Sequence, residues 1–186
     1  MKIGIFGGSF NPPHNMHKNI ALDLINNGYV DKVIYIPVGD NYNKKELISF
    51  KDRYEMLSLM IEEYSNLDVS DIGSDINYQF TYQTLDYFKS INNKDLIYFI
   101  CGTDNLALFD TWKRYEYILN NYKLLVIKRN HDDIEYLLDK YKDYKDNIII
   151  TNVTPKVLSS SFIRSNIDNK KVKENLDHKV YKYIKR

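Results

Sequence analysis

The amino-acid sequence predicts an α/β protein with a doubly wound parallel sheet of about five to six strands and helices on both faces. Short apolar runs alternate with helical patterns along the whole chain. Strands that are separated by helices form parallel sheets, because each crossover helix covers one face of the sheet. No internal repeat, low-complexity segment or linker interrupts this pattern. We therefore expect one Rossmann-like domain over residues 1–186, with a helical C-terminal segment at about 159–186 as part of it.

Six apolar runs are the strand candidates, and turn residues bound several of them. Pro37 and Gly39 stop the second run, and Gly102 ends the fourth, which is the clearest buried strand. The third run is the weakest signal. The runs cover residues 2–6, 33–36, 67–70, 96–101, 124–127 and 148–150.

Apolar residues at helical spacing predict helices between these strands. Ile20, Ala21, Leu24 and Ile25 mark the first helix, and a helix over 105–120 is expected to break near Thr111. The other helices are expected over residues 50–64, 81–91, 132–142, 159–167 and 172–184. Serines at 159–161 are good N-cap residues, so they favour a helix start there.

Composition excludes several classes of function. The 186 residues have a formal net charge of +1, so bulk charge gives no reason to expect nucleic-acid or membrane binding. The single cysteine, Cys101, excludes an intrachain disulfide and a multi-cysteine metal site. No apolar run approaches the ~20 residues of a membrane span, and the chain opens on a core strand rather than a signal peptide. A cytoplasmic protein is expected.

The turn at residues 7–17 is the strongest candidate site. A strand ends in a glycine-rich loop that opens a helix with His14 and His17, which suits an anion such as a nucleotide phosphate. A zinc pair or two surface histidines are the alternatives. Zinc is disfavoured because no H-E-x-x-H pattern and no nearby cysteine accompany the pair. The chain also lacks the G-x-x-x-x-G-K-[ST] and G-x-G-x-x-G phosphate-binding patterns.

Doubly wound sheets bind ligands at the carboxyl ends of their strands. The loops that follow strands one, two, four and six should therefore gather at one edge. They contain residues 7–17, 39–45, 102–112 and 159–164.

The first of these loops resembles the opening signature of the nucleotidylyltransferase superfamily. Gly-Ser-Phe-Asn-Pro-Pro-His-Asn-Met-His is similar to a G-x-F-[D/N]-P turn followed by [T/H]-x-G-H, in the form typical of nicotinate and nicotinamide mononucleotide adenylyltransferases. Met16 stands where most bacterial members have glycine and resembles the eukaryotic branch. The resemblance implies that Gly8, Ser9 and Phe10 belong to the ATP-phosphate loop.

Three further segments match the same family in order. Residues 37–47 resemble the P-V-G-D-x-Y-x-K-K-x-L segment of its eukaryotic branch, rather than the P-P-H-K segment usual in bacterial nicotinate-type members. This resemblance implies a phosphate contact for Lys44 and a place in the mononucleotide pocket for Tyr42. Taken alone, this segment reads as a solvated loop. Residues 158–164 resemble I-S-S-T-x-I-R, whose helix terminus and arginine hold the β- and γ-phosphates of ATP. The matching residues are Ser159, Ser160, Ser161 and Arg164.

The remaining matches concern the mononucleotide. The turn with Gly102 and Asp104, followed by Trp112, resembles a family turn whose tryptophan stacks on the pyridine ring of the substrate. Without the resemblance, Asp104 reads equally as a helix cap and Trp112 as a core residue. Thr84 resembles a pocket residue of the family, although surface polarity of a helix also explains it.

The resemblance therefore implies one nucleotidylyltransferase domain that transfers an adenylyl group from ATP to nicotinate or nicotinamide mononucleotide, giving deamido-NAD or NAD and pyrophosphate. His14, His17, Lys44 and Arg164 are the expected catalytic residues, and Mg²⁺ is expected to be bound mainly through the ATP phosphates. Phosphopantetheine adenylyltransferase and a non-catalytic pyridine-nucleotide sensor are the alternatives. The choice between the two mononucleotides and the existence of a homo-oligomer stay open at this point.

Overall fold

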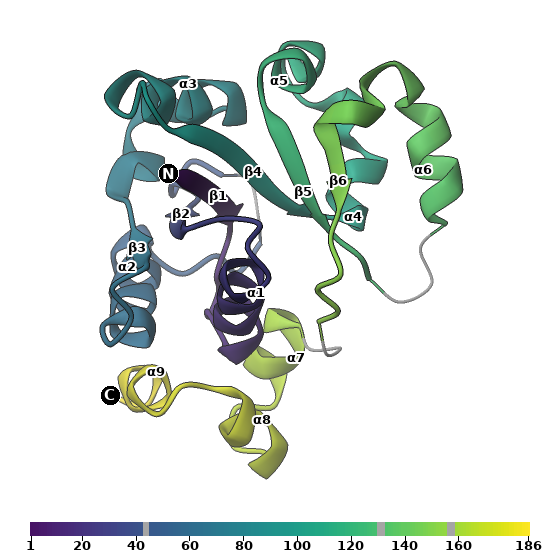
Figure 1. Ribbon diagram of the computed structural model, residues 1–186. Helices are drawn as coiled ribbons and strands as arrows, with labels where there is room; N and C mark the ends of the chain where they lie inside the picture. Colours follow the sequence, from purple (N-terminus) through teal and green to yellow (C-terminus); the bar gives the residue numbers. More distant parts are fainter. Residues whose placement is uncertain (43–44, 130–132, 156–158) are drawn as a thin grey trace.

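A single twisted sheet organises the protein (Figure 1). The computed structural model describes residues 1–42, 45–129, 133–155 and 159–186. Within these residues, six parallel strands lie in the order β3-β2-β1-β4-β5-β6. They are β1 (Lys2–Gly8), β2 (Lys32–Pro37), β3 (Leu67–Val69), β4 (Leu96–Gly102), β5 (Lys123–Ile127) and β6 (Ile148–Ile150). Every strand coincides with an expected apolar run, so the prediction of a doubly wound parallel sheet is confirmed.

Helices cover both faces of the sheet, as the sequence predicts. Figure 1 shows α1, α2 and α7 to α9 on one side and α3 to α6 on the other. The helices are α1 (Asn15–Asn26), α2 (Phe50–Ile61), α3 (Thr81–Ile91), α4 (Thr103–Ala107), α5 (Tyr115–Asn121), α6 (Ile134–Lys140), α7 (Ser160–Ser165), α8 (Lys170–Asn175) and α9 (His178–Ile184). The short 3₁₀ turns are η1 (Asp71–Ser74), η2 (Ile76–Tyr78), η3 (Phe109–Thr111) and η4 (Lys142–Asn147). Among the described residues, no helix is both long enough and apolar enough to cross a membrane.

Alternation along the strands divides the apolar core into two clusters. On β4, Tyr98 and Ile100 pack toward α1 and α2, whereas Phe99 and Cys101 pack toward α3 to α6. Successive side chains of a strand point to opposite faces, so a strand buried on both faces reads as a continuous apolar run. Burial raises the pKa of the Cys101 thiol far above its ordinary value. Cys101 is therefore a buried core residue whose thiol stays protonated near neutral pH.

The switch point of the topology lies between β1 and β4. These two strands pair in parallel, with Ile5 opposite Phe99. The helix after β1 packs on one face, whereas the helices after β4 pack on the other. Their connections therefore diverge, and the sheet edge between them is the place where doubly wound folds bind ligands.

Two expected helices are broken. The break predicted near Thr111 occurs, and the segment forms α4, η3 and α5, with Arg114 in a left-handed conformation at φ 58° before α5. The expected helix at 172–184 is wrong as one element. Leu176 is extended, and Asp177 caps a separate helix, α9, by accepting a hydrogen bond from Lys179 N at 3.0 Å.

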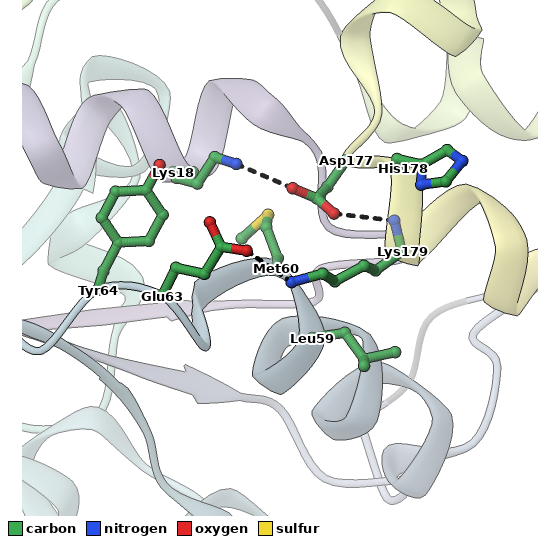
Figure 2. Close-up of a pocket in the computed structure, with 8 residues that line it drawn as sticks. All are labelled: Lys18, Leu59, Met60, Glu63, Tyr64, Asp177, His178 and Lys179. Atoms are coloured by element: carbon green, nitrogen blue, oxygen red, sulfur yellow. Dashed lines mark hydrogen bonds and ion pairs between the residues drawn. The ribbon is translucent and has the colours of Figure 1, made fainter.

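The break is stabilised from a distant part of the chain. Asp177 also pairs with Lys18 of α1, with 3.0 Å between Oδ2 and Nζ. Lys179 pairs with Glu62 and Glu63 at the end of α2. Lys18, Asp177, Lys179 and Glu63 line a hollow between α1, α2 and α9 (Figure 2). Its volume is about 220 Å³. This hollow lies among helices and away from the strand ends.

Asp177→Ala should destabilise the fold, because it removes both the N-cap of α9 and the partner of a mostly buried lysine. We expect the free energy of unfolding to fall by about 1–2 kcal/mol. Asp168→Ala is the matched control, since Asp168 pairs with Lys185 at an exposed surface and should change stability little. Urea unfolding of both variants measures the difference. Equal effects would contradict the capping role.

Candidate active site

The loop after β1 has a constrained backbone. Phe10 adopts a left-handed conformation at φ 45°, and its buried ring lies 3.0 Å from where a Cβ on Gly8 would stand. Glycine at position 8 therefore leaves room for this ring. The Phe10 ring meets His17 edge-on, with 5.0 Å between ring centroids. The predicted loop residues Gly8, Ser9 and Phe10 thus lie directly before the turn that leads into α1, and the Phe10 ring packs against His17 of that helix.

The two histidines lie at the start of α1 and contact each other. Their ring centroids are 3.8 Å apart. The backbone N–H of His14 donates to His17 Nδ1 at 3.2 Å, and the backbone N–H of His17 donates to the His14 carbonyl at 2.9 Å. His14 is the N-cap residue rather than a helical residue. The pair thereby orders the first turn of the helix.

Burial keeps both rings neutral near pH 7. Desolvation, with a smaller effect of Arg129, lowers the pKa of His14 to about 4. Desolvation, then His14 and Arg129, lowers the pKa of His17 well below its ordinary value. Because His17 Nδ1 accepts a hydrogen bond, the neutral ring carries its proton on Nε2. Near neutral pH these histidines therefore act as hydrogen-bonding groups rather than as cations.

Polar atoms of the same loop are left without partners. Asn11 Oδ1, His14 Nδ1 and Asn15 Oδ1 are buried and accept or donate no hydrogen bond within the described parts of the chain. Buried polar groups in native proteins are normally hydrogen-bonded. Three such atoms within five residues indicate a place where water or a ligand completes the bonding.

The turn after β4 brings Asp104 against Arg129. A Cβ on Gly102 would collide with Asp104 Oδ1 and lie 3.4 Å from Arg129 Nε, so glycine allows this close approach. Asp104 Oδ2 and Arg129 Nη1 are 3.4 Å apart, and both side chains are at least half exposed. The backbone N–H of Arg129 donates to Thr103 Oγ1 at 3.2 Å.

Arg129 is a site residue that the sequence analysis missed. It follows β5, and the rule that selected the loops after four other strands applies equally to this one. Its guanidinium is close enough to lower the pKa of both histidines. Arg129 therefore supplies positive charge at the carboxyl ends of the central strands.

Helix α7 docks on the loop after β1, which joins residues far apart in sequence. Arg164 Nη1 donates to the Asn11 carbonyl at 2.7 Å, and Ser160 Oγ donates to the Pro12 carbonyl at 3.1 Å. Ser159 caps the helix by accepting from Phe162 N. Arg164 Nη2 is 3.5 Å from Ser161 Oγ and 3.3 Å from a carboxylate oxygen of Glu46. The loops predicted after strands one and six are thus brought together.

The other predicted residues occupy different settings. Tyr42 is 56% exposed on the loop after β2, and Lys44 lies outside the described residues. Thr84 is buried on α3. Trp112 is half-buried, and its ring packs 4.9 Å from that of Phe109 and 5.8 Å from that of Phe99. Trp112 therefore makes the contacts expected of a core residue, and its stacking on a pyridine ring stays a prediction.

This arrangement agrees with the comparisons to known proteins. The family model described as cytidylyltransferase-like matches residues 5–166. The chain belongs to this family. Matching residues include the histidine loop, the turn with Asp104 and the helix with Arg164.

Relatives of this cytidylyltransferase-like protein match it over its whole length. It is 36% identical to a protein of Caldicellulosiruptor bescii named as a probable nicotinate-nucleotide adenylyltransferase, over 100% of this chain and 97% of the relative. It is 32% identical to a protein of Clostridium tetani with the same name, over 100% and 96%. The family resemblance that the sequence motifs indicated is confirmed.

A solved structure supports the fold of this cytidylyltransferase-like protein. It is the Plasmodium falciparum nicotinic acid mononucleotide adenylyltransferase complexed with NaAD, which is similar with a TM-score of 0.81 at 22% sequence identity. The similarity covers 98% of this chain and 94% of that one. At this identity the likeness is evidence for the Rossmann-like fold alone.

The buried histidines predict a pH-dependent stability. Between pH 6.5 and about 4, the unfolded chain binds a proton at position 14 that the folded protein does not. The free energy of unfolding should therefore fall as the pH falls through this window, by on the order of 3 kcal/mol from His14 alone. Urea unfolding at several pH values measures this slope, and His14→Asn should reduce it.

Arg129→Gln tests whether Arg129 contributes to the lowered pKa of His14. Removing the nearby cation should raise the pKa of His14 toward its ordinary value, which imidazole NMR titration detects. A stability that is independent of pH between 6.5 and 5 would contradict the assignment of neutral, buried rings.

Proposed function

We propose that the protein transfers the adenylyl group of ATP to a pyridine mononucleotide in NAD biosynthesis, with release of pyrophosphate. The observation that carries this proposal is the histidine pair at the switch point of the sheet, in which a buried His14 contacts a partly buried His17 beside unpaired polar atoms. Two cationic side chains, Arg129 and Arg164, come to the same edge from distant loops. The names of the relatives support this reaction.

The chemistry requires positioning more than proton transfer. A phosphate oxygen of the mononucleotide attacks the α-phosphorus of ATP, and the bond from that phosphorus to the oxygen bridging to the β-phosphate breaks. The nucleophile is already an anion near neutral pH, so no strong general base is needed. The protein must align two anionic groups and stabilise the charge that develops on the phosphates.

Different residues serve this task in different ways. His17 presents Nε2–H as a neutral donor, and the unpaired Nδ1 of His14 can carry that ring's proton and donate it to a phosphate oxygen. Arg129 and Arg164 supply the positive charge, and a guanidinium suits a phosphate because its N–H groups can bind two oxygens. Lys44 stays a sequence-based proposal for a further phosphate contact. Ser159, Ser160 and Ser161 surround the start of α7 and are proposed for the same polyphosphate.

The mononucleotide is proposed to lie nearer β4. Asp104 is half exposed and can accept hydrogen bonds from ribose hydroxyls. The exposed part of Trp112 offers an aromatic surface for a pyridine ring, and Tyr42, Thr84 and Gly102 are proposed to complete the pocket. Nicotinate mononucleotide is favoured over nicotinamide mononucleotide, because the relatives named above carry the nicotinate name.

Mg²⁺ is proposed to arrive as part of the substrate MgATP. Within the described residues, no three side chains of His, Cys, Asp or Glu are grouped so that they could hold a metal ion. Mg²⁺ prefers oxygen ligands and commonly binds through substrate phosphates with several waters. Bound there, it would neutralise part of the triphosphate charge.

ATP and a mononucleotide are then the partners, and a cytoplasmic location suits enzymes that use such metabolites. No partner among nucleic acids or membranes is proposed. A homo-oligomer remains an expectation that an amphipathic C-terminal segment alone does not decide, because α9 packs on α2 of the same chain.

The deciding experiment is an assay with three acceptors in parallel. The purified protein is incubated with MgATP and either nicotinate mononucleotide, nicotinamide mononucleotide or phosphopantetheine, and pyrophosphate and the adenylylated product are measured. Turnover should be fastest with nicotinate mononucleotide. Turnover with phosphopantetheine alone would replace the proposal, and tight binding of NAD without turnover would favour a sensor.

His17→Ala should lower kcat/KM by about 10²–10³-fold, because it removes a preorganised donor at the reacting phosphates. The fold should survive this change, and far-UV circular dichroism of the variant checks that its helices and strands are retained. His178→Ala is the control, because His178 is exposed on α9 and away from the strand ends. Full activity of a folded His17→Ala protein would remove this histidine from the mechanism.

A further inference from the structure

Helix α2 contains a fully buried arginine that the catalytic assignments do not use. Arg53 is 0% exposed. Removing a guanidinium from water is costly, and such a group is tolerated only when its donors are paired. The partners of Arg53 therefore indicate what the residue is for.

Its three side-chain hydrogen bonds go to two loops beside the site. Arg53 Nη1 donates to the Ser9 carbonyl at 3.2 Å, in the loop after β1. Arg53 Nε donates to the Ile48 carbonyl at 2.9 Å, and Nη2 donates to Asp40 Oδ1 at 3.2 Å. Asp40 and Ile48 stand near the beginning and the end of the connection between β2 and α2. One planar side chain thus joins two neighbouring loops.

The backbone at these contacts has little freedom of its own. Ser9 precedes Phe10, whose left-handed conformation is unfavourable for a residue with a side chain. The two loops leave adjacent strands, because Gly8 of β1 lies opposite Pro37 of β2 and the Gly8 carbonyl accepts from Val38 N at 3.0 Å. The backbone N–H of Phe50 also donates to Asp40 Oδ1 at 2.6 Å.

The base of this arrangement is itself anchored. Ser49 caps α2 by accepting from Asp52 N at 3.1 Å, and Tyr183 of α9 donates to Asp52 Oδ1 at 2.8 Å. The helix that presents Arg53 is therefore held against the C-terminal segment. A fixed helix and a forked side chain together define the separation of the two loops.

We propose that Arg53 is a positioning residue, which sets the distance between the loop after β1 and the loop after β2 and thereby the alignment of the two substrates. This inference rests on the proposed function, in which the first loop holds ATP phosphates and the second contributes to the mononucleotide site. Arg53 acts through Ser9, Asp40 and Ile48 and contacts no substrate. Its effect should therefore appear in kcat more than in either KM.

Arg53→Lys is the informative variant, because it keeps the charge and loses the fork. A single ammonium cannot reach three acceptors in the directions that the guanidinium satisfies. Asp40→Ala is the second variant, since Asp40 lies at the surface and its loss should leave the fold intact. Asp68→Ala is the matched control. Asp68 likewise pairs with one cation, Lys32, and accepts from one backbone N–H, but lies on the edge strand β3.

Hydrogen exchange tests the coupling of the loops without any assay of activity. In Arg53→Lys, amides in peptides 8–17 and 45–50 should exchange faster together, and Asp40→Ala should do the same to a smaller extent. Asp68→Ala should leave both peptides unchanged. Faster exchange in peptide 45–50 alone, or in neither peptide, would overturn the proposal.

Kinetics then separates positioning from simple stability. Arg53→Lys should lower kcat by about 10- to 100-fold while both KM values change by less than about threefold. A lower melting temperature with unchanged kcat would mean that Arg53 only stabilises the fold, and the proposal would fail. If the wild-type protein released no pyrophosphate, the proposed function would fail, and the exchange data alone would decide whether Arg53 couples the loops.

Discussion

The site depends on a topological constraint at β1 and β4. The strands are neighbours, but the helices that follow them pack on opposite faces of the sheet. The connections that follow β1 and β4 must therefore diverge at the carboxyl ends of these strands. The first helix begins there with its N–H groups facing the edge, and α7 returns to the same place 148 residues after Pro12, through Ser160. Residues from the connections after β1, β2, β4, β5 and β6 consequently meet around one edge.

Neutral and charged groups occupy different parts of the site. The histidines at the base of the site are buried and neutral, whereas the arginines reach the edge from later connections. Neutral donors cost less to bury than charged ones, so the base of the site can be buried without an uncompensated charge. The charge of Arg129 lies where water still screens it, whereas the Arg164 side chain is largely covered by the loop after β1. In the proposed function, such an arrangement would orient a phosphate at the base of the site and balance its charge from the exposed edge.

The sequence predicted the sheet, its order of elements and the candidate loops well, because apolar runs and turn residues are local signals. It did not predict the break at Leu176, because Val172, Leu176 and Val180 face the same core on both sides of the break and the apolar stripe continues across it. The cap that separates the helices depends on Lys18, which is distant in sequence. Arg53 had no local signature either, since an arginine in a helical pattern normally reads as a solvated residue. Arg129 could have been found by extending the strand-end rule to the fifth strand.

The exposure of Arg129 has a consequence for the timing of binding. Its side chain is 62% exposed, so dissolved ions screen its attraction for a phosphate over a Debye length of about 8 Å at physiological ionic strength. The buried histidine pair acts only at contact and is shielded from those ions. Added salt should therefore slow the capture of an anionic nucleotide from solution, while the step that follows at the base of the site proceeds at nearly its original rate. The rate of nucleotide association would thus depend on salt concentration, whereas the rate of the chemical step would depend on it little.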